Sequence, residues 1–519
     1  MRKKGCTPNS GLMLSVFDHG PFAPCPTSFN MAAHVLAHAD RLSDKVALVE
    51  VGLSGAQHWA YARLAAAVRG TGTGLLNAGF KTGDILLMRI GNSVDFPIAY
   101  LGAIAVGMVP VPTSAQLTTR EVQGIVDELQ PAGILRDPAI ACPTVACPVI
   151  ETMALRMMQD LPPADYAMGD PERLAYIAYT SGTSGKSRAV MHAHRAIWAR
   201  RMMHKDWHRL TEQDRLMHAG AFNWTYTLGT GLMDPWSVGA TALIPKTDVT
   251  PGDIPSLLKR HESSIFAATP GVYRKILNHH KSIVLPNLRH GLSAGEKLSD
   301  SLRQNWKNAA GRELYEAFGM SECSTFISAS PDSPAKPGTL GRPQRGRRVA
   351  IVGPEGPVEL GSEGVIAIHR RDPGLMLGYY GAPEETAERF QNDWFLTGDH
   401  GSMDEDGQIT YLARADDMMN AGGYRVSPLE VEAALSDLPG VSEIGVTDCE
   451  IKADVRLIIA FYTGTPQNES AMKAVAARRL ARYKQPRAYV HLPDLPRNPN
   501  GKLKRSALRD AWIARPDPS

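Results

Sequence analysis

One short stretch, residues 178–188, constrains this chain more than any other part of its sequence. An apolar run over residues 174–179 leads into it and predicts a buried strand. Hydroxyl residues interleaved with glycines follow, together with two cations, Lys186 and Arg188. Glycines let backbone N–H groups converge on an anion, hydroxyls add donors, and the cations supply positive charge. The stretch therefore predicts a phosphate-binding loop rather than a simple surface turn.

The P-loop of nucleoside triphosphatases is the first motif to compare with this stretch, because the stretch contains Gly185-Lys186-Ser187 near its end. That fingerprint requires a glycine five positions before Gly185, where this chain has Thr180. The residues after Arg188 are apolar and typical of a strand, whereas a P-loop opens a helix. Both differences argue against a P-loop.

The stretch instead resembles the phosphate loop of the adenylate-forming superfamily, which includes acyl-CoA synthetases, amino-acid adenylation domains and luciferase-like enzymes. The usual form there is Thr-Ser-Gly-Thr-Thr-Gly-Lys-Pro-Lys-Gly, and this chain departs from it at Ser184, Ser187, Arg188 and Ala189. The resemblance implies that this loop steadies the β- and γ-phosphates of ATP, with Thr180 and Lys186 also acting in catalysis. The implied ATP-binding residues are Thr180, Ser181, Gly182, Thr183, Ser184, Gly185 and Lys186.

Length and composition favour a large soluble protein. The chain of 519 residues is long enough for several domain-sized units, and its 43% hydrophobic and 21% charged residues are ordinary values. A net charge of +3 argues against nucleic acid or an anionic membrane as a partner. No run approaches the ~18 apolar residues of a membrane span. The six cysteines show no metal-ligand spacing. So few cysteines in so large a chain predict a reduced, cytoplasmic protein.

The first part of the chain predicts an arm followed by a layered domain. Residues 1–28 predict an irregular arm, because their apolar run is broken by Ser15 and lacks the core of a signal peptide. Helical and strand patterns then alternate to about residue 151, which predicts a parallel sheet covered by helices. The predicted helices cover 31–39, 60–78 and 96–105, and the predicted strands cover 85–88 and 109–112.

An aromatic cluster follows the strand predicted at residues 216–220. In the superfamily this position lines the acid-binding pocket, so the resemblance places Phe222, Trp224 and Tyr226 there. Aromatic residues in such a cluster also serve simply as core packing. Amino-acid adenylation domains usually carry Asp after the Phe, to hold the substrate's ammonium, and Asn223 stands there. Because a neutral amide cannot replace that ion pair, an α-amino acid substrate is disfavoured.

Two later segments match the superfamily's adenine and metal motifs. Residues 288–296 end a predicted strand in small residues, against which a planar ring can lie. Residues 318–322 resemble the motif Tyr-Gly-x-Thr-Glu, in which the Glu holds magnesium, so Glu322 is the predicted metal ligand and a catalytic residue. The implied nucleotide-binding residues are Ala294, Gly295, Glu296, Phe318, Gly319 and Ser321. The implied acid-pocket residues are Gly291, Ser293, Met320 and Phe326.

The strongest local match is Trp-Phe-Leu-Thr-Gly-Asp, which ends at Asp399. The resemblance implies that Asp399 accepts hydrogen bonds from both ribose hydroxyls. Arg414 lies where the family has Gly-Arg-x-Asp-Asp, so it is expected to contact ribose or phosphate. Asp416, in the same motif, falls on the position about which the family's carboxy-terminal domain turns.

A glycine-rich hairpin follows that hinge. In acyl-CoA synthetases this hairpin lines the tunnel for the pantetheine of CoA, which implies a CoA-binding role for Gly422, Gly423 and Tyr424. A plain β-turn would require the two glycines as well.

The last hundred residues predict a small domain of strands and one helix, at 444–446, 457–462, 472–481 and 488–490. A polar turn rich in proline and asparagine then leads to Lys502. The superfamily's Pro-x-x-x-x-Gly-Lys match makes Lys502 the catalytic lysine. Its ammonium is expected to bridge the attacking carboxylate and the α-phosphate as charge builds.

The motifs run in the family's order from about residue 29 to 508. The implied α/β fold has a large N-terminal domain of helix-flanked β-sheets (29–415) and a small, mobile α+β C-terminal domain (416–519). The implied reaction is ATP- and magnesium-dependent ligation of a carboxylic acid to CoA through an acyl-adenylate, releasing AMP and pyrophosphate. Rotation about Asp416 is expected to exchange Lys502 for the hairpin.

Several alternatives stay open. Loading of an acyl carrier protein is the nearest rival, although the chain ends after Lys502 without a carrier domain. The departures at Ser187, Ala189 and Ala413 leave a non-catalytic nucleotide- or acyl-binding relative, and the motifs do not exclude luciferase-type oxidation. The expected partners are a small carboxylic acid and CoA, with a homodimer and a lysine acetyltransferase acting on Lys502 left open.

The acid is the least constrained part of the prediction. The spacing of Phe222 and Tyr226 is similar to that of benzoate-CoA ligases, but those enzymes commonly carry His where Thr325 stands. The absence of that His argues against benzoate itself. The predicted substrate is an aromatic, alicyclic or medium-chain acid, held in a closed apolar pocket of Trp224, Tyr226, Met320 and Phe326.

Overall fold

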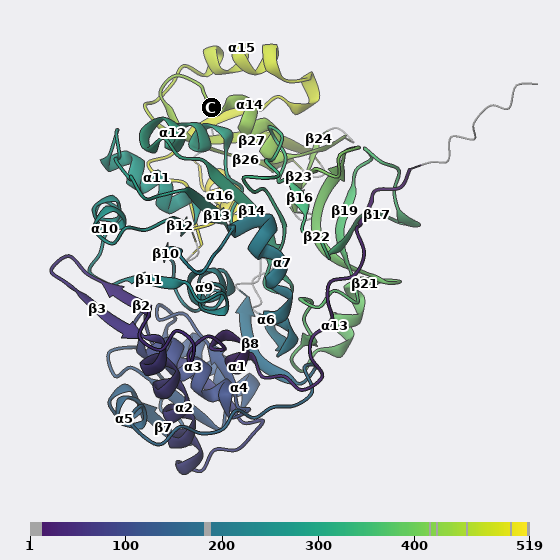
Figure 1. Cartoon of the computed structure of the whole chain (residues 1–519). Helices are drawn as coiled ribbons and strands as arrows, with labels where there is room; N and C mark the ends of the chain where they lie inside the picture. The colour runs from purple at the N-terminus through teal and green to yellow at the C-terminus, as the bar shows by residue number, and fades with distance from the viewer. Residues whose placement is uncertain are drawn as a thin grey trace, which may run out of the picture.

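The structure is a computed structural model that describes residues 13–180, 188–414, 417–421, 424–452, 455–498 and 501–515. Several sheets flanked by helices make up the part up to Arg414, and the C-terminal segments, drawn in yellow, lie above them in Figure 1. This arrangement agrees with the predicted α/β class.

A nine-stranded sheet organises the region that carries most of the predicted site. Its order is β16-β15-β14-β13-β12-β10-β11-β2-β3, and the six strands from β14 to β2 pair in parallel. Parallel strands bring their carboxyl ends to one edge, so segments distant in sequence meet there. The strands are β2 (Val46–Val51), β3 (Ala56–Ala60), β10 (Arg215–His218), β11 (Thr241–Pro245), β12 (Ile265–Ala268), β13 (His290–Ala294), β14 (Leu314–Met320), β15 (Ser324–Ser328) and β16 (Arg342–Pro343).

Helices bury this sheet through apolar side chains. Leu257, Tyr273 and Trp306, from three of these helices, lie in one fully buried cluster with strand residues such as Phe266. The helices on and beside the sheet are α6 (Arg195–Ala199), α7 (Arg201–Met203), α8 (Thr225–Leu228), α9 (Asp234–Ser237), α10 (Ile254–Arg260), α11 (Pro270–His279) and α12 (Asp300–Ala310), with π-helical turns η1 (His204–His208) and η2 (Gly229–Met233).

The parallel sheet predicted near the amino terminus is confirmed. Its order is β5-β4-β6-β7, with every pair parallel. One predicted helix is shorter than expected: α1 ends at Val35, with Asn30 capping its start. The elements are α1 (Met31–Val35), α2 (Tyr61–Asn77), α3 (Asp95–Ala105), α4 (Thr119–Leu129), α5 (Thr152–Met158), β4 (Ile85–Arg89), β5 (Val109–Pro112), β6 (Gly133–Arg136) and β7 (Val149–Glu151).

Two further sheets complete the large region. One has the order β20-β9-β8, and the other runs β1-β17-β19-β22-β21, with β18 and β23 attached. The strands are β8 (Leu174–Thr180), β9 (Arg188–Ala193), β17 (Arg348–Gly353), β18 (Gly356–Pro357), β19 (Gly364–His369), β20 (Gly378–Tyr379), β21 (Phe390–Gln391), β22 (Trp394–Met403) and β23 (Ile409–Arg414), and helix α13 (Pro383–Glu388) lies beside them.

The prediction of a wholly irregular arm over residues 1–28 is wrong for part of its described portion. Residues 16–18 form strand β1 (Val16–Asp18), which pairs antiparallel with β17. The edge of β17 presents backbone groups that need partners, and an extended segment satisfies them whatever its side-chain pattern. Phe17 is buried against the same sheet, which adds an apolar contact.

The C-terminal segments form a small α+β unit. The strand predicted at 444–446 is the centre of a much longer one, because β26 and β27 pair along nearly their whole length. A final helix, α16, was not predicted. The elements are β24 (Met419–Ala421), β25 (Tyr424–Val426), α14 (Pro428–Leu435), β26 (Val441–Lys452), β27 (Val455–Gly464), α15 (Glu469–Arg479), the short η3 (Arg482–Lys484), β28 (Ala488–His491) and α16 (Arg505–Ile513).

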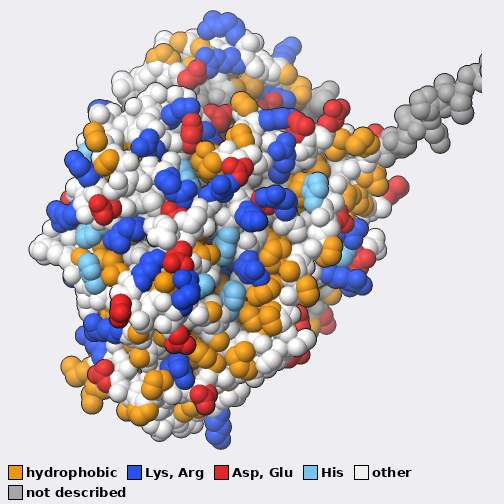
Figure 2. Space-filling view, in the orientation of Figure 1, with side chains coloured by type: hydrophobic (Ala, Val, Ile, Leu, Met, Phe, Trp, Pro, Cys, Tyr) orange, Lys and Arg blue, Asp and Glu red, His pale blue; other side chains and the backbone are white. Residues whose placement is uncertain are grey.

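The surface gives no sign of a strongly charged interface on the face shown in Figure 2, where cationic and anionic side chains are interspersed. Within the described part of the chain, every helix is too short or too polar to cross a membrane.

Candidate active site

Four charged residues of the large region, Arg414, Asp399, Glu296 and Glu322, act electrostatically on Lys502. The Lys502 side chain reaches solvent. Burial by surrounding protein, followed by the charge of Arg414, nevertheless lowers the pKa of Lys502 below its ordinary value. The carboxylates of Asp399, Glu296 and Glu322 act on it in the opposite direction. Residues predicted from four separate motifs therefore lie close enough to act electrostatically on one ammonium.

The turn that carries Lys502 is held by contacts from both parts of the chain. Arg274 on α11 forms an ion pair with Glu443 on β26 at 2.8 Å, and Arg497 reaches the same oxygen, also at 2.8 Å. Gly501, at φ +82°, packs so closely that an added methyl would lie 3.2 Å from Glu296 Oε1. These contacts place the Lys502 turn against the segment that follows β13.

Asp399 is a buried carboxylate held by two neighbours. It lies opposite Arg414 in the register of β22 and β23. The hydroxyl of Tyr411 donates a hydrogen bond of 3.1 Å to Asp399 Oδ1. Burial raises the pKa of Asp399, and the nearby Arg414 opposes that rise. A fixed carboxylate of this kind is suited to accept hydrogen bonds from a pair of hydroxyl groups.

Glu322 follows β14 and contacts β20. The hydroxyl of Tyr379 donates a hydrogen bond of 2.8 Å to Glu322 Oε1, and Glu322 is half-buried. Among the described residues there is no group of three or more metal-ligating side chains. A magnesium ion here would rely on one carboxylate and the phosphates of a nucleotide, which is a usual arrangement for this ion. Glu322 fits such a role.

The predicted adenine platform lies beside Asp399. The ring of Phe318 is 5.5 Å from that of Tyr411 and 5.4 Å from that of Phe326, measured between centroids. Phe318 is half-buried, whereas Phe326 is fully buried beneath it. Phe318 therefore keeps a surface open to a ligand, and Phe326 supports it from the core.

The predicted acid pocket divides into exposed and buried members. Trp224 and Tyr226 are half-buried, and the Trp224 indole would lie 3.9 Å from a methyl group added to Gly295. Phe222 is fully buried with its centroid 5.5 Å from that of Phe96, so it packs in the core.

Three small or flexible members complete the predicted pocket. Gly291 allows close packing by Tyr273, because an added methyl would meet the phenol oxygen at 2.7 Å. Ser293 is buried with its hydroxyl unpaired, and Met320 is half-buried at the end of β14.

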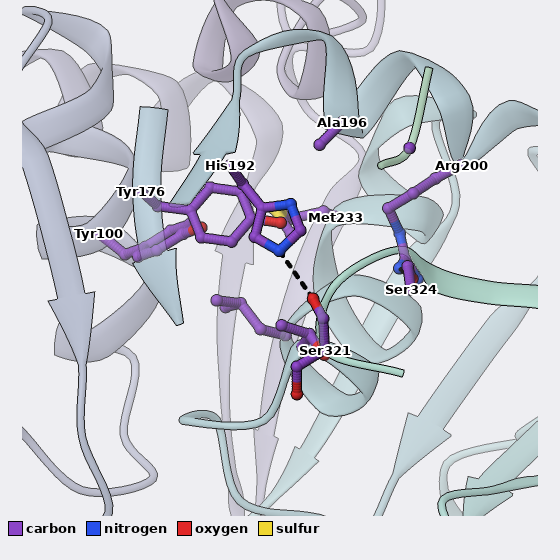
Figure 3. Close-up of a pocket in the computed structure, with 11 residues that line it drawn as sticks. Tyr100, Tyr176, His192, Ala196, Arg200, Met233, Ser321 and Ser324 are labelled. Atoms are coloured by element: carbon purple, nitrogen blue, oxygen red, sulfur yellow. Dashed lines mark hydrogen bonds between the residues drawn. The ribbon is translucent and has the colours of Figure 1, made fainter. Parts of the chain in front are cut away.

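A small cavity of about 20 Å³ adjoins this region (Figure 3). Its lining combines hydroxyls, an imidazole and a guanidinium with apolar side chains. None of the seven residues predicted to line the acid pocket lines this cavity. The lining residues are Tyr100, Tyr176, His192, Ala196, Arg200, Thr225, Leu228, Met233, Ser321, Ser324 and Gly374.

Arg200 is the charged member of the cavity. Its Nε and Nη2 donate to the two oxygens of buried Asp234 at 2.7 and 2.6 Å. Nη2 also donates to Thr230 at 3.1 Å, and Nη1 donates to Ser324. The guanidinium is therefore already paired with a carboxylate inside the protein.

Several predicted residues lie outside the described part of the chain, namely Ser181, Gly182, Thr183, Ser184, Gly185, Lys186, Asp416, Gly422 and Gly423. Thr180 ends β8, Tyr424 begins β25, and Arg188 starts β9 in an ion pair with Glu385. The roles assigned to these residues stay predictions.

Sequence reasoning missed the tyrosines that hold the two carboxylates. Tyr379 lies in a Gly-Tyr-Tyr run and Tyr411 in a predicted strand, and neither lies next to the acid that it contacts. His192 and Arg200 were also missed. An unusual density of histidine and arginine in residues 188–209 was the one available signal.

Comparison with known proteins agrees with the geometry. The AMP-binding enzyme family matches residues 35–380, and the AMP-binding enzyme C-terminal domain matches residues 430–502. A 3-hydroxybenzoate–CoA ligase of Aromatoleum sp. (strain CIB) is 30% identical, over 91% of this chain and 94% of its own length. A benzoate–CoA ligase of Thauera aromatica is 28% identical, over 96% and 99%.

Among solved structures, a benzoate CoA ligase from Burkholderia xenovorans LB400 has a TM-score of 0.81 and 25% identity, covering 93% of this chain and 100% of its own. Both the motif order and the architecture thus agree with the two family matches, which together reach from the first sheets to Lys502. The chain is therefore a member of the AMP-binding enzyme family.

Proposed function

We propose that this protein is an ATP-dependent carboxylic acid:CoA ligase that activates an aromatic acid as its acyl-adenylate. The observation that carries the proposal is the convergence of Asp399, Arg414, Glu296 and Glu322 on Lys502. The relatives named as CoA ligases for benzoate and 3-hydroxybenzoate support both the reaction and the acid class.

The first step joins the acid to AMP. A carboxylate oxygen attacks the α-phosphorus of ATP, the bond to the bridging oxygen breaks, and pyrophosphate leaves. Lys502 stabilises the charge that develops between carboxylate and α-phosphate, while Asp399 and Arg414 hold the ribose end in line. The phosphate-loop residues from Thr180 to Lys186 steady the leaving pyrophosphate. Magnesium held by Glu322 would add charge neutralisation at the phosphates.

The second step transfers the acyl group to CoA. The thiol attacks the carbonyl carbon of the adenylate, AMP leaves, and a thioester forms. Rotation of the C-terminal domain, residues 416–519, about Asp416 withdraws Lys502 and presents Gly422, Gly423 and Tyr424 to the pantetheine. One cleft then serves two transition states in turn.

Other features follow the same proposal. An acyl carrier protein is the alternative acceptor, and a non-catalytic binding protein is the alternative without chemistry. Acetylation of Lys502 would remove the charge that the first step needs, which makes a lysine acetyltransferase a candidate regulator. The proposal places the enzyme in the cytoplasm and allows a homodimer.

The experiment is pyrophosphate release across a panel of carboxylic acids with ATP and magnesium, with and without CoA. Acid-dependent release that turns over only with CoA, and yields an acyl-CoA, supports the proposal. A stoichiometric burst that CoA does not convert to turnover would favour a carrier protein. Silence across the panel, with ATP still bound, would favour the binding protein.

A further inference from the structure

We propose that the small, partly polar cavity beside the acid pocket binds a hydroxyl or amino substituent of the acid, so that hydrogen-bond donor groups on the ring determine which substrate is preferred. The proposal rests on the proposed ligase function and names the substrate class for it. Tyr100 and His192 are the specificity-determining residues.

The cavity lies next to the residues predicted to hold the acid and the metal. Its lining includes Ser321, the neighbour of Glu322, and Thr225, the neighbour of Trp224, and both are half-buried. Its volume of about 20 Å³ exceeds what one water-sized group needs but is too small for a second ring. A substituent of one heavy atom fits it.

His192 supplies a hydrogen-bond acceptor to this cavity. Its Nε2 lies 2.7 Å from the backbone oxygen of Ser321. The dashed line in Figure 3 marks this hydrogen bond. Because a carbonyl only accepts, Nε2 carries the proton and Nδ1 presents a bare lone pair. Burial also lowers the pKa of His192 to about 4, so the ring is neutral near pH 7. Nδ1 is buried and has no hydrogen-bond partner among the residues that the structure describes.

Tyr100 contributes a second unpaired group. Within the described part of the chain its hydroxyl has no hydrogen-bond partner, and its side chain is fully inaccessible to solvent. Tyr176 lies between the two residues, stacked on His192 at 4.8 Å and edge-on to Tyr100 at 6.0 Å. A buried polar atom costs free energy until it is hydrogen-bonded, so two such atoms around one cavity would be stabilised by a hydrogen-bonding group of a ligand.

The charges around the cavity favour a neutral substituent. Arg200 is the cation in the lining, and Asp234 already binds it through both carboxylate oxygens. A second carboxylate on the acid would therefore enter without a counter-charge. An acceptor-only group, such as fluorine or a methoxy oxygen, would leave His192 Nδ1 unpaired. The cavity thus favours O–H and N–H groups.

The test compares kcat/KM for acid-dependent pyrophosphate release among benzoates substituted at each ring position with hydroxyl, amino, fluoro or methoxy groups, beside benzoate itself. At one ring position the hydroxyl or amino acid is expected to exceed both the fluoro acid and benzoate by about 10- to 100-fold. Equal or better use of the fluoro acid or benzoate would overturn the proposal. Failure of every acid would instead contradict the ligase function.

Tyr100→Phe removes one hydroxyl and keeps the ring. It is expected to lower the ratio of hydroxybenzoate to benzoate activity about tenfold. Tyr489→Phe is the matched control, because Tyr489 also has a buried, unpaired hydroxyl but lies in the C-terminal unit. An unchanged ratio in Tyr100→Phe, with the thermal midpoint kept, would mean that the cavity holds only water and would overturn the proposal.

Discussion

Buried polar groups near the predicted nucleotide site differ from those near the predicted acid pocket in whether they are hydrogen-bonded. On the nucleotide side, Glu322 accepts a hydrogen bond from Tyr379 and Asp399 accepts one from Tyr411. Both carboxylates are oriented before any ligand binds. Such preorganisation avoids the cost of reorientation during the reaction.

On the acid side, Tyr100 and His192 each keep a buried polar atom without a partner. An unsatisfied group destabilises the free protein and is completed only by the right ligand. The difference indicates where the enzyme is generic and where it is selective. ATP is the same in every turnover, so fixed tyrosine donors can hold the two carboxylates on its side. On the acid side, the proposed cavity is completed by one kind of substituent.

The largest loss of activity is expected from removing the ammonium of Lys502. Lys502→Ala should lower adenylation about 1000-fold, since loss of one donor aimed at developing negative charge costs 10²- to 10³-fold or more. Acid-dependent pyrophosphate release measures this loss. Thioester formation from a supplied acyl-adenylate is the control and should be nearly unaffected. A variant that retains a tenth of wild-type adenylation would contradict the role of Lys502.

Low pH should reduce the free energy of unfolding, because the buried histidines near the acid pocket are neutral in the folded protein. Burial lowers the pKa of His192 to about 4 and that of His218 to about 3. The unfolded chain therefore binds more protons below its ordinary histidine pKa near 6.5, so stability present above pH 6.5 is lost as pH falls toward 4. Each of these histidines contributes about 1.4 kcal/mol per pH unit in that window.

Thermal unfolding between pH 7.5 and 5 measures this loss. His218→Asn should flatten the curve relative to the wild type. An unchanged slope in that variant would mean that His218 is not buried in its neutral form.

A smaller effect is expected from removing a tyrosine hydroxyl that holds a carboxylate near the nucleotide site. Tyr379→Phe removes the donor to Glu322, and a hydrogen bond to a charged group is worth about 1.5–3 kcal/mol. Apparent affinity for magnesium-ATP should fall about tenfold, as measured by KM. Tyr380→Phe, which changes the neighbouring residue instead, is the matched control and should stay within about twofold. An equal loss in both variants would point to general loosening of the strand.

The smallest expected effect concerns the contact between the two parts of the chain. Glu443→Gln weakens the ion pairs with Arg274 and Arg497, which are partly exposed and so worth about 0.2–1 kcal/mol. Adenylation should fall about two- to threefold, while thioester formation is not slowed. Slowing of both steps by the same factor would argue that these pairs do not favour one domain arrangement.

The site residues that lie in local motifs could be predicted from the sequence alone. Asp399, Arg414, Glu322 and Lys502 were predicted from their motifs, and the fold brings them together. The parallel sheet around β4 followed from apolar strands separated by helices. Strand β1 could not be predicted, because it forms only where the edge of β17 needs a partner.

The cavity could not be predicted from the sequence either. Tyr176 and His192 meet because of the register between β8 and β9, and Tyr100 reaches them from α3. No spacing along the chain encodes those contacts. The sequence predicted an apolar pocket because aromatic and other apolar residues occur in the matching motifs. The cavity is partly polar because strand register and helix packing determine which side chains line it.

The most direct test of the account is to identify the products formed from ATP, CoA, magnesium and a hydroxybenzoate in one reaction. The proposed reaction yields equal amounts of AMP, pyrophosphate and the aroyl-CoA, with an acyl-adenylate trapped when CoA is omitted. Formation of ADP and phosphate, or nucleotide cleavage that does not depend on the acid, would contradict it.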